Sequence, residues 1–153
     1  MTPAKKTTST RSTSASGFSA EERAAMKERA EELRSSGRGG KKKADEAQAL
    51  LDKIAEMSQP DRGLAEQLHS LITEVAPELE HKTWYGMPAY AREGKVMIFF
   101  QPAEKFGARY ATLGFNDIAQ LDDGTLWPTA YAVTELSDAE VKKLEKLVRR
   151  AVS

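Results

Sequence analysis

Residues 81–100, HKTWYGMPAYAREGKVMIFF, decide the fold, because turn-forming and strand-forming residues alternate over a short distance. The run at 96–100 is apolar throughout, which is typical of a central strand covered on both faces. The sequence EGK at 93–95 predicts a hairpin turn before that strand. Gly86 and Pro88 should bend or bulge the chain, because glycine packs no side chain and proline donates no backbone hydrogen bond.

The region around this stretch has the pattern of a small sheet. Segment 84–131 holds 10 of the chain's 11 aromatic residues, and turn signals divide it into short pieces. We expect strands at 82–86, 88–93, 96–100, 106–115 and 126–133, paired as an antiparallel meander. The sequence NDIAQL at 116–121 predicts a short helix capped by Asn116 or Asp117.

Helices are predicted on both sides of this region. Apolar residues recur at helical spacing in 44–57 and 60–76, and a further helix begins at Ser137, where Glu140 completes a capping box. The core-facing residues include Leu50, Ile54, Leu64, Leu68, Ile72, Leu144 and Val148. This order predicts an α+β fold, with helices packed on one face of an antiparallel sheet of about five strands.

The chain divides into three parts. Residues 1–17 contain nine Ser or Thr and no large apolar residue after Met1, which is typical of a disordered tail. Residues 18–43 predict an exposed charged helix followed by a flexible basic linker, because Met26 and Leu33 are the only large apolar residues of the helix body. Residues 44–153 form the compact domain.

Charge separates along the chain although the formal net charge is zero. Residues 1–43 have a balance of +6, and residues 44–153 have a balance of −6. The basic arm is either a solubilising tail or a loose attachment to nucleic-acid phosphates. Aromatic residues do not alternate with its charges, which favours the tail and argues against a nucleic-acid partner.

Several classes of function are excluded or disfavoured by composition. The chain has no cysteine, so disulfides, thiolate metal ligands and a thiol nucleophile are excluded. No apolar stretch approaches the ~18 residues of a membrane helix, and we expect a soluble cytoplasmic protein without a membrane partner. No nucleophile elbow or triad motif is found, so we expect no enzymatic activity.

Two groups of residues could bind a metal ion. Glu66 and His69 have the i, i+3 spacing of carboxylate-bridged metal bundles, but both fall away from the apolar face of their helix, which favours a surface position. Glu78, Glu80 and His81 lie beside the first strand, and such oxygen and imidazole ligands suit iron or another divalent ion. The competing interpretation of this second group is a solvated connection between a helix and a strand.

The aromatic residues could line a pocket or simply fill the core. Trp84, Tyr85, Met87 and Tyr90 are the candidates for a ligand or partner surface. The helices can cover one face of the sheet, yet several strands are apolar on both faces. The uncovered face should therefore hold a groove, a folded-back segment or a dimer partner.

The sequence YGMPAY at 85–90, followed by Gly94-Lys95 and an apolar run, resembles the YdhG-like family, long classed as a domain of unknown function. Glu78 matches an acidic helix end of the family pattern, and the resemblance spans roughly residues 45–150. It implies a frataxin-like α+β fold, and some members are described as intracellular iron chaperones. Family members commonly carry lysines before an aromatic-proline pair, and this chain keeps the pair at 127–128 without the lysines.

These observations and the resemblance predict a non-enzymatic cytoplasmic domain that binds iron weakly through Glu78, Glu80 and His81 and passes it to an iron-accepting protein. The expected cofactor is iron or none. The alternative is a small-ligand or protein-binding module, including self-association, that uses the aromatic surface around YGMPAY.

Overall fold

The computed structural model describes residues 17–37 and 43–153. The predicted tail, apart from Gly17, and most of the predicted linker lie outside these residues. Within them the chain forms four helices, which are α1 (Ala20–Gly37), α2 (Lys43–Glu56), α3 (Asp61–Val75) and α4 (Asp138–Val152). The five strands are β1 (Glu80–Trp84), β2 (Met87–Arg92), β3 (Lys95–Gln101), β4 (Ala111–Phe115) and β5 (Ala130–Val133).

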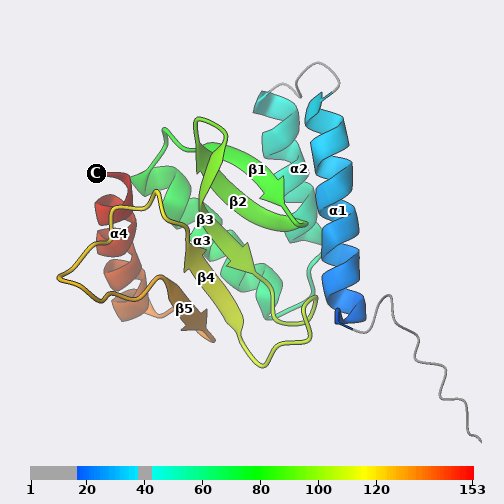
Figure 1. Cartoon of the computed structure of the whole chain (residues 1–153). Helices are drawn as coiled ribbons and strands as arrows, with labels where there is room; N and C mark the ends of the chain where they lie inside the picture. Colours follow the sequence, from blue (N-terminus) through cyan, green and yellow to red (C-terminus); the bar gives the residue numbers. More distant parts are fainter. Residues whose placement is uncertain (1–16, 38–42) are drawn as a thin grey trace, which may run out of the picture.

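The predicted α+β class is confirmed. The five strands form one sheet in the order β1-β2-β3-β4-β5, and each neighbouring pair is antiparallel (Figure 1). The predicted central strand is β3, where Met97 and Ile98 are fully buried and Phe100 is 1% exposed. Its continuous apolar run therefore reflects a position in the middle of the sheet.

Two tight turns connect the first three strands. Tyr85-Gly86 joins β1 to β2, and Glu93-Gly94 joins β2 to β3, with φ values of 53°, 74°, 51° and 78° in chain order. Positive φ at both central residues is the mark of a type I′ turn, whose twist matches that of a hairpin. The bend predicted at Gly86 is thus a hairpin turn, and the irregularity in β2 lies further on, at Tyr90/Ala91.

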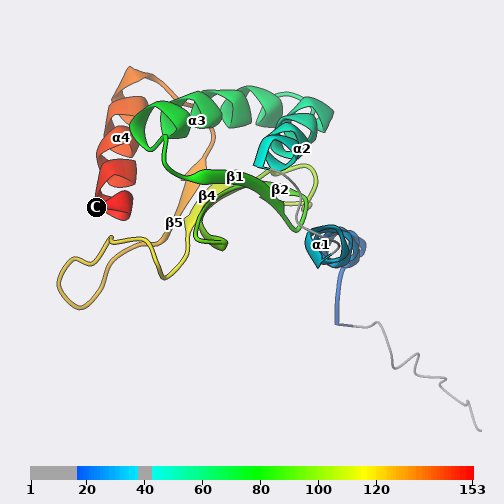
Figure 2. The same ribbon diagram turned by 90° about the horizontal axis from the view of Figure 1, so that it is seen from above.

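The helices cover the sheet unequally. Figure 2 shows α2, α3 and α4 on one side of the sheet, while α1 lies apart, beside the β1–β2 turn. Leu50, Ile72 and Val148, one from each covering helix, are fully buried in a core shared with β3 and β4. The capping box at Ser137 and Glu140 is present at the start of α4. No helix in the described ranges is long and apolar enough to cross a membrane.

Four segments differ from their predicted structure. β1 spans Glu80–Trp84 rather than 82–86, so Tyr85 and Gly86 lie outside it. β4 begins at Ala111 rather than at 106, and β5 begins at Ala130 rather than at 126. The segment 116–121 is a turn and not a helix. Asn116 explains the last difference, because its backbone N–H bonds to Met97 O at 2.9 Å and its side-chain amide bonds to Val96 O at 3.1 Å. The Gln120 N–H, which would donate to Asn116 O in a helix, donates instead to Ala151 O of α4 at 3.0 Å.

Candidate functional site

The strained turn between β1 and β2 is held by a carboxylate from α1. Glu32 accepts the Tyr85 N–H through Oε2 at 3.1 Å and the Gly86 N–H through Oε1 at 2.9 Å. Arg29 lies with its guanidinium carbon 5.8 Å from the centre of the Tyr85 ring and pairs with Glu32 at 3.3 Å. A positive φ at tyrosine is uncommon, so these contacts stabilise a backbone that the turn alone would not favour.

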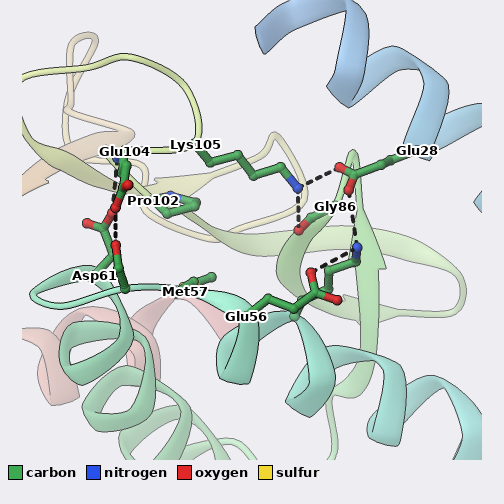
Figure 3. Close-up of a pocket in the computed structure, with 10 residues that line it drawn as sticks. Glu28, Glu56, Met57, Asp61, Gly86, Pro102, Glu104 and Lys105 are labelled. Carbon is green, nitrogen blue, oxygen red and sulfur yellow. Dashed lines mark hydrogen bonds and ion pairs between the residues drawn. The ribbon is translucent and has the colours of Figure 1, made fainter.

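One turn before Glu32 in α1, Glu28 anchors an ion-pair network. Its carboxylate contacts Lys105 at 2.5 Å and Lys53 at 3.1 Å, which ties α1 to the β3–β4 loop and to α2 (Figure 3). Partial burial alone would raise the pKa of Glu28, but the two lysines outweigh it and lower that pKa. Lys105 also donates to Gly86 O at 3.3 Å. The helix predicted to be exposed is therefore docked along this one edge.

A cavity of about 510 Å³ opens beside this network. Figure 3 shows Glu28, Gly86 and Lys105 on one side of it and Asp61 and Glu104 on another. Asp61 is 4% exposed, and it accepts the Glu104 N–H at 3.0 Å. Glu28, Asp61 and Lys105, which line the cavity, already have partners, and their contacts attach α1 and the β3–β4 loop to the domain.

The predicted metal ligands line a second, smaller cavity at the β1 edge of the sheet. This acidic edge cavity has a volume of about 250 Å³. Its charged and imidazole-bearing residues are Lys43, Glu46, Glu78, Glu80 and His81. The structure thus places all three predicted ligands at one surface and adds Glu46 from α2, which the sequence did not single out.

These side chains do not form a preformed metal centre. Among the residues that the structure describes, no group of three or more His, Asp or Glu is arranged to hold a metal ion. Glu78 instead pairs with Arg92 at 3.6 Å. Glu80 and His81 are consecutive in a strand, where successive side chains point to opposite faces. The assignment of Glu78, Glu80 and His81 as ligands stays a prediction.

Three polar rings meet on the covered face of the sheet. His69 Nδ1 lies 2.8 Å from the Tyr90 hydroxyl, and the ring centres of His69 and His81 are 5.1 Å apart. Burial lowers the pKa of both histidines, and the neighbouring His81 lowers that of His69 further. Burial raises the pKa of Tyr90. Both imidazoles are therefore disposed to remain neutral near pH 7.

This cluster corrects the predicted surface position of His69. Glu66 is exposed and lies 4.0 Å from Arg62, as its place on the helical wheel indicated. His69 is partly buried, because it contacts Tyr90 of the sheet. The apolar stripe of α3 faces the core, and the side of the helix that carries His69 also faces this strand. A wheel drawn for one helix cannot include that neighbouring strand.

The predicted aromatic surface is smaller than expected. Tyr90 is 1% exposed and Met87 is 5% exposed, so neither can contribute to a contact surface. Trp84 and Tyr85 are partly exposed, with ring centres 5.1 Å apart. The Trp84 ring is also 5.1 Å from that of Phe99, and these three residues form what we call the aromatic strip.

The aromatic strip lies on the sheet face opposite α3. His81 contacts His69 of α3, so Trp84, three residues later in the same strand, points to the other face. Phe99 lies on that same face, because it pairs with Ala89, while the next residue, Tyr90, contacts His69 on the covered face. In the other neighbouring strand Phe99 stands opposite Gly114. A Cβ atom at Gly114 would lie 2.1 Å from Phe99 Cζ, so this glycine lets the ring pack flat on the neighbouring strand.

The sequence analysis did not identify Glu28, Glu32 or Lys105. A signal is present, because Glu28 and Glu32 are four residues apart and share one face of α1 with Ala25, which is 4% exposed. Charged residues at this spacing usually face solvent, and nothing in the local sequence points to the turn that they contact.

Comparisons of the chain with models of protein families, with curated protein sequences and with solved structures found no match.

Replacing Glu32 by alanine should release the β1–β2 turn. We expect amide hydrogen exchange at Tyr85 and Gly86 to accelerate by on the order of tenfold or more, because each amide loses a charge-assisted acceptor. Exchange measured by NMR reads both sites directly. Glu31→Ala, an exposed neighbour on the same helix, is the matched control. Unchanged exchange at Tyr85 and Gly86 would contradict the role assigned to Glu32.

The histidine pair predicts a loss of stability at mildly acidic pH. Because the folded-state pKa of His69 and His81 is lowered from 6.5, the unfolded state binds more protons as pH falls below that value. The stability that the two neutral histidines contribute should be fully present above about pH 6.5. The free energy of unfolding should then decline toward pH 5, which is still above the range where most carboxylates titrate. Each pKa unit of separation corresponds to about 1.4 kcal/mol.

Denaturant unfolding at pH 7, 6 and 5 measures this effect. His81→Gln keeps a polar side chain on the strand but cannot become charged, so its unfolding free energy should vary less over the same range. An identical pH dependence for wild type and variant would show that the pair does not titrate as described.

Proposed function

We propose that this chain is a non-enzymatic, cytoplasmic metal-binding protein of the YdhG-like type, which binds iron weakly in the acidic edge cavity and delivers it to an acceptor protein. The single observation that carries the proposal is the gathering of Glu46, Glu78, Glu80 and His81 around one open cavity. Carboxylate and imidazole ligands are compatible with ferrous iron.

The arrangement of these groups supports weak and reversible binding. Glu78 has to leave Arg92, its partner at 3.6 Å, before it can coordinate a cation. Residues from α2, the α3–β1 connection and β1 also have to converge. Both steps oppose binding, and they favour release when a better ligand set approaches. Such behaviour suits a carrier rather than a permanent metal centre.

Titration of the protein with Fe(II) under anaerobic conditions tests this proposal. We expect saturable heat in calorimetry and paramagnetic broadening of NMR signals near residues 78–81. Glu46→Gln with Glu80→Gln removes two carboxylates without altering the histidine cluster, and it should weaken binding by at least about tenfold, as expected for lost contacts to a charge.

The matched control is Glu66→Gln with Glu74→Gln, which removes the same charge from exposed positions on α3. Binding that is absent in the wild type, or that is weakened equally by both pairs of substitutions, would overturn the proposal.

A second function is favoured by the aromatic strip. Trp84 and Tyr85 remain partly exposed on the sheet face that α2, α3 and α4 leave uncovered, and a partner protein or a second copy of this chain could cover them (Figure 2). Aromatic residues of this kind are enriched in protein interfaces.

Sedimentation velocity at increasing protein concentration tests self-association. If the aromatic strip joins two copies, the wild type should sediment as a dimer at high concentration, and Trp84→Ala should restore the monomer. A monomer at every concentration would remove self-association from consideration, and dimers unaffected by Trp84→Ala would place the interface elsewhere.

A further inference from the structure

The opposite edge of the sheet carries a cavity of different chemistry. This α4 cavity, of about 470 Å³, lies between segment 121–131 and α4. It is lined by two aromatic residues and four cations, which are Trp127, Tyr131, Lys142, Lys143, Lys146 and Arg150. Asp123 is the single carboxylate among the described residues around it. It is separate from the acidic edge cavity, because β1 and β5 are opposite edges of the sheet.

The lysines of this cavity are not neutralised within the domain. Lys142, Lys146 and Arg150 are spaced by four residues, so they form one cationic stripe along α4. Like charges at this spacing destabilise a helix slightly. In residues 17–37 and 43–153, no carboxylate pairs with Lys142 or Lys146. An anion bound from solution would relieve this repulsion.

Contacts of Arg150 and Tyr131 fix the walls of the cavity. Arg150 donates to Leu121 O at 3.4 Å and to Asp122 O at 3.3 Å, which ties the loop to α4. The Tyr131 ring packs edge-on against Phe115, with ring centres 6.1 Å apart. Tyr131 is therefore held by the core and Arg150 by the loop, so the cavity exists before any ligand arrives.

We propose that the α4 cavity binds a nucleoside monophosphate, or a ligand of the same chemistry, in which a doubly charged phosphate is joined to a flat aromatic ring. Lys142 and Lys146 would hold the phosphate, and the ring would lie against Trp127 or Tyr131. An aromatic side chain holds a nucleobase by stacking, because every base has a flat π-face. The volume of about 470 Å³ falls within the ordinary range for small-ligand sites.

NMR titration of the full chain with adenosine 5′-monophosphate tests this proposal. The chain has two tryptophans, so the two indole N–H signals report on different sites in one spectrum. We expect a saturable shift of the Trp127 indole and of amides in 142–150, with no shift at Trp84. Adenosine alone and inorganic phosphate should each bind at least about tenfold more weakly, because each lacks one half of the recognition.

Charge-matched variants separate a specific site from general attraction. Lys142→Gln with Lys146→Gln should weaken binding by at least about tenfold. Lys27→Gln with Lys95→Gln removes the same charge from exposed positions on α1 and β3 and should leave binding unchanged. Thermal unfolding of both variants shows that each is folded.

Three results would overturn the proposal. The first is the absence of a saturable Trp127 shift in the wild-type protein. The second is equal weakening by the two pairs of substitutions. The third is binding of a single-stranded oligonucleotide that tightens with its length while the mononucleotide does not bind, because that pattern belongs to an extended nucleic-acid surface.

Discussion

Two hairpin turns, each with two consecutive residues of positive φ, are the constraint on which the rest of the structure depends. The Tyr85-Gly86 turn fixes the register of β1 on β2, and the Glu93-Gly94 turn fixes the start of the β2–β3 register, which shifts by one residue at Tyr90/Ala91. That register places His81 opposite Tyr90 on the covered face. A slip of one residue would turn every side chain to the other face and would separate this pair from His69.

The helices are attached to this sheet by two different kinds of interaction. α2, α3 and α4 bury apolar residues in a common core, and their attachment depends on the hydrophobic effect. α1 buries little apolar surface, and Glu28 and Glu32 attach it through ion pairs and backbone hydrogen bonds. Partly exposed ion pairs stabilise weakly and are screened by salt, so we expect α1 to detach more easily than the helices held by the core. Its attachment also supports the strained Tyr85, so detachment would affect the turn.

Local sequence was sufficient for most elements and insufficient for the contacts between them. The bend at Gly86, the turn at 93–95, the central strand at 96–100 and the capping box at Ser137 follow from short-range chemistry, and each is present. Pro88 does not interrupt the ladder as predicted, because it pairs with Thr83. The prediction of a helix at 116–121 was wrong, because Asn116 bonds to β3 and does not cap a helix. The predicted surface position of His69 was wrong, because the residue contacts Tyr90, which lies 21 residues later in the chain. The same limit applies to the site, where Glu46 approaches Glu78 and Glu80 only in the folded chain.

Although the net charge of the chain is zero, acidic and basic residues gather at opposite edges of the sheet. Carboxylates outnumber the single lysine around the acidic edge cavity beside β1, whereas lysines outnumber the single carboxylate around the α4 cavity beyond β5. Three strands separate these edges, each ~4.8 Å from the next, so the distance between them exceeds the Debye length of ~8 Å at physiological salt. The two charge clusters therefore act as nearly independent fields. One edge attracts cations and the other attracts anions, and neither preference can be deduced from the total charge.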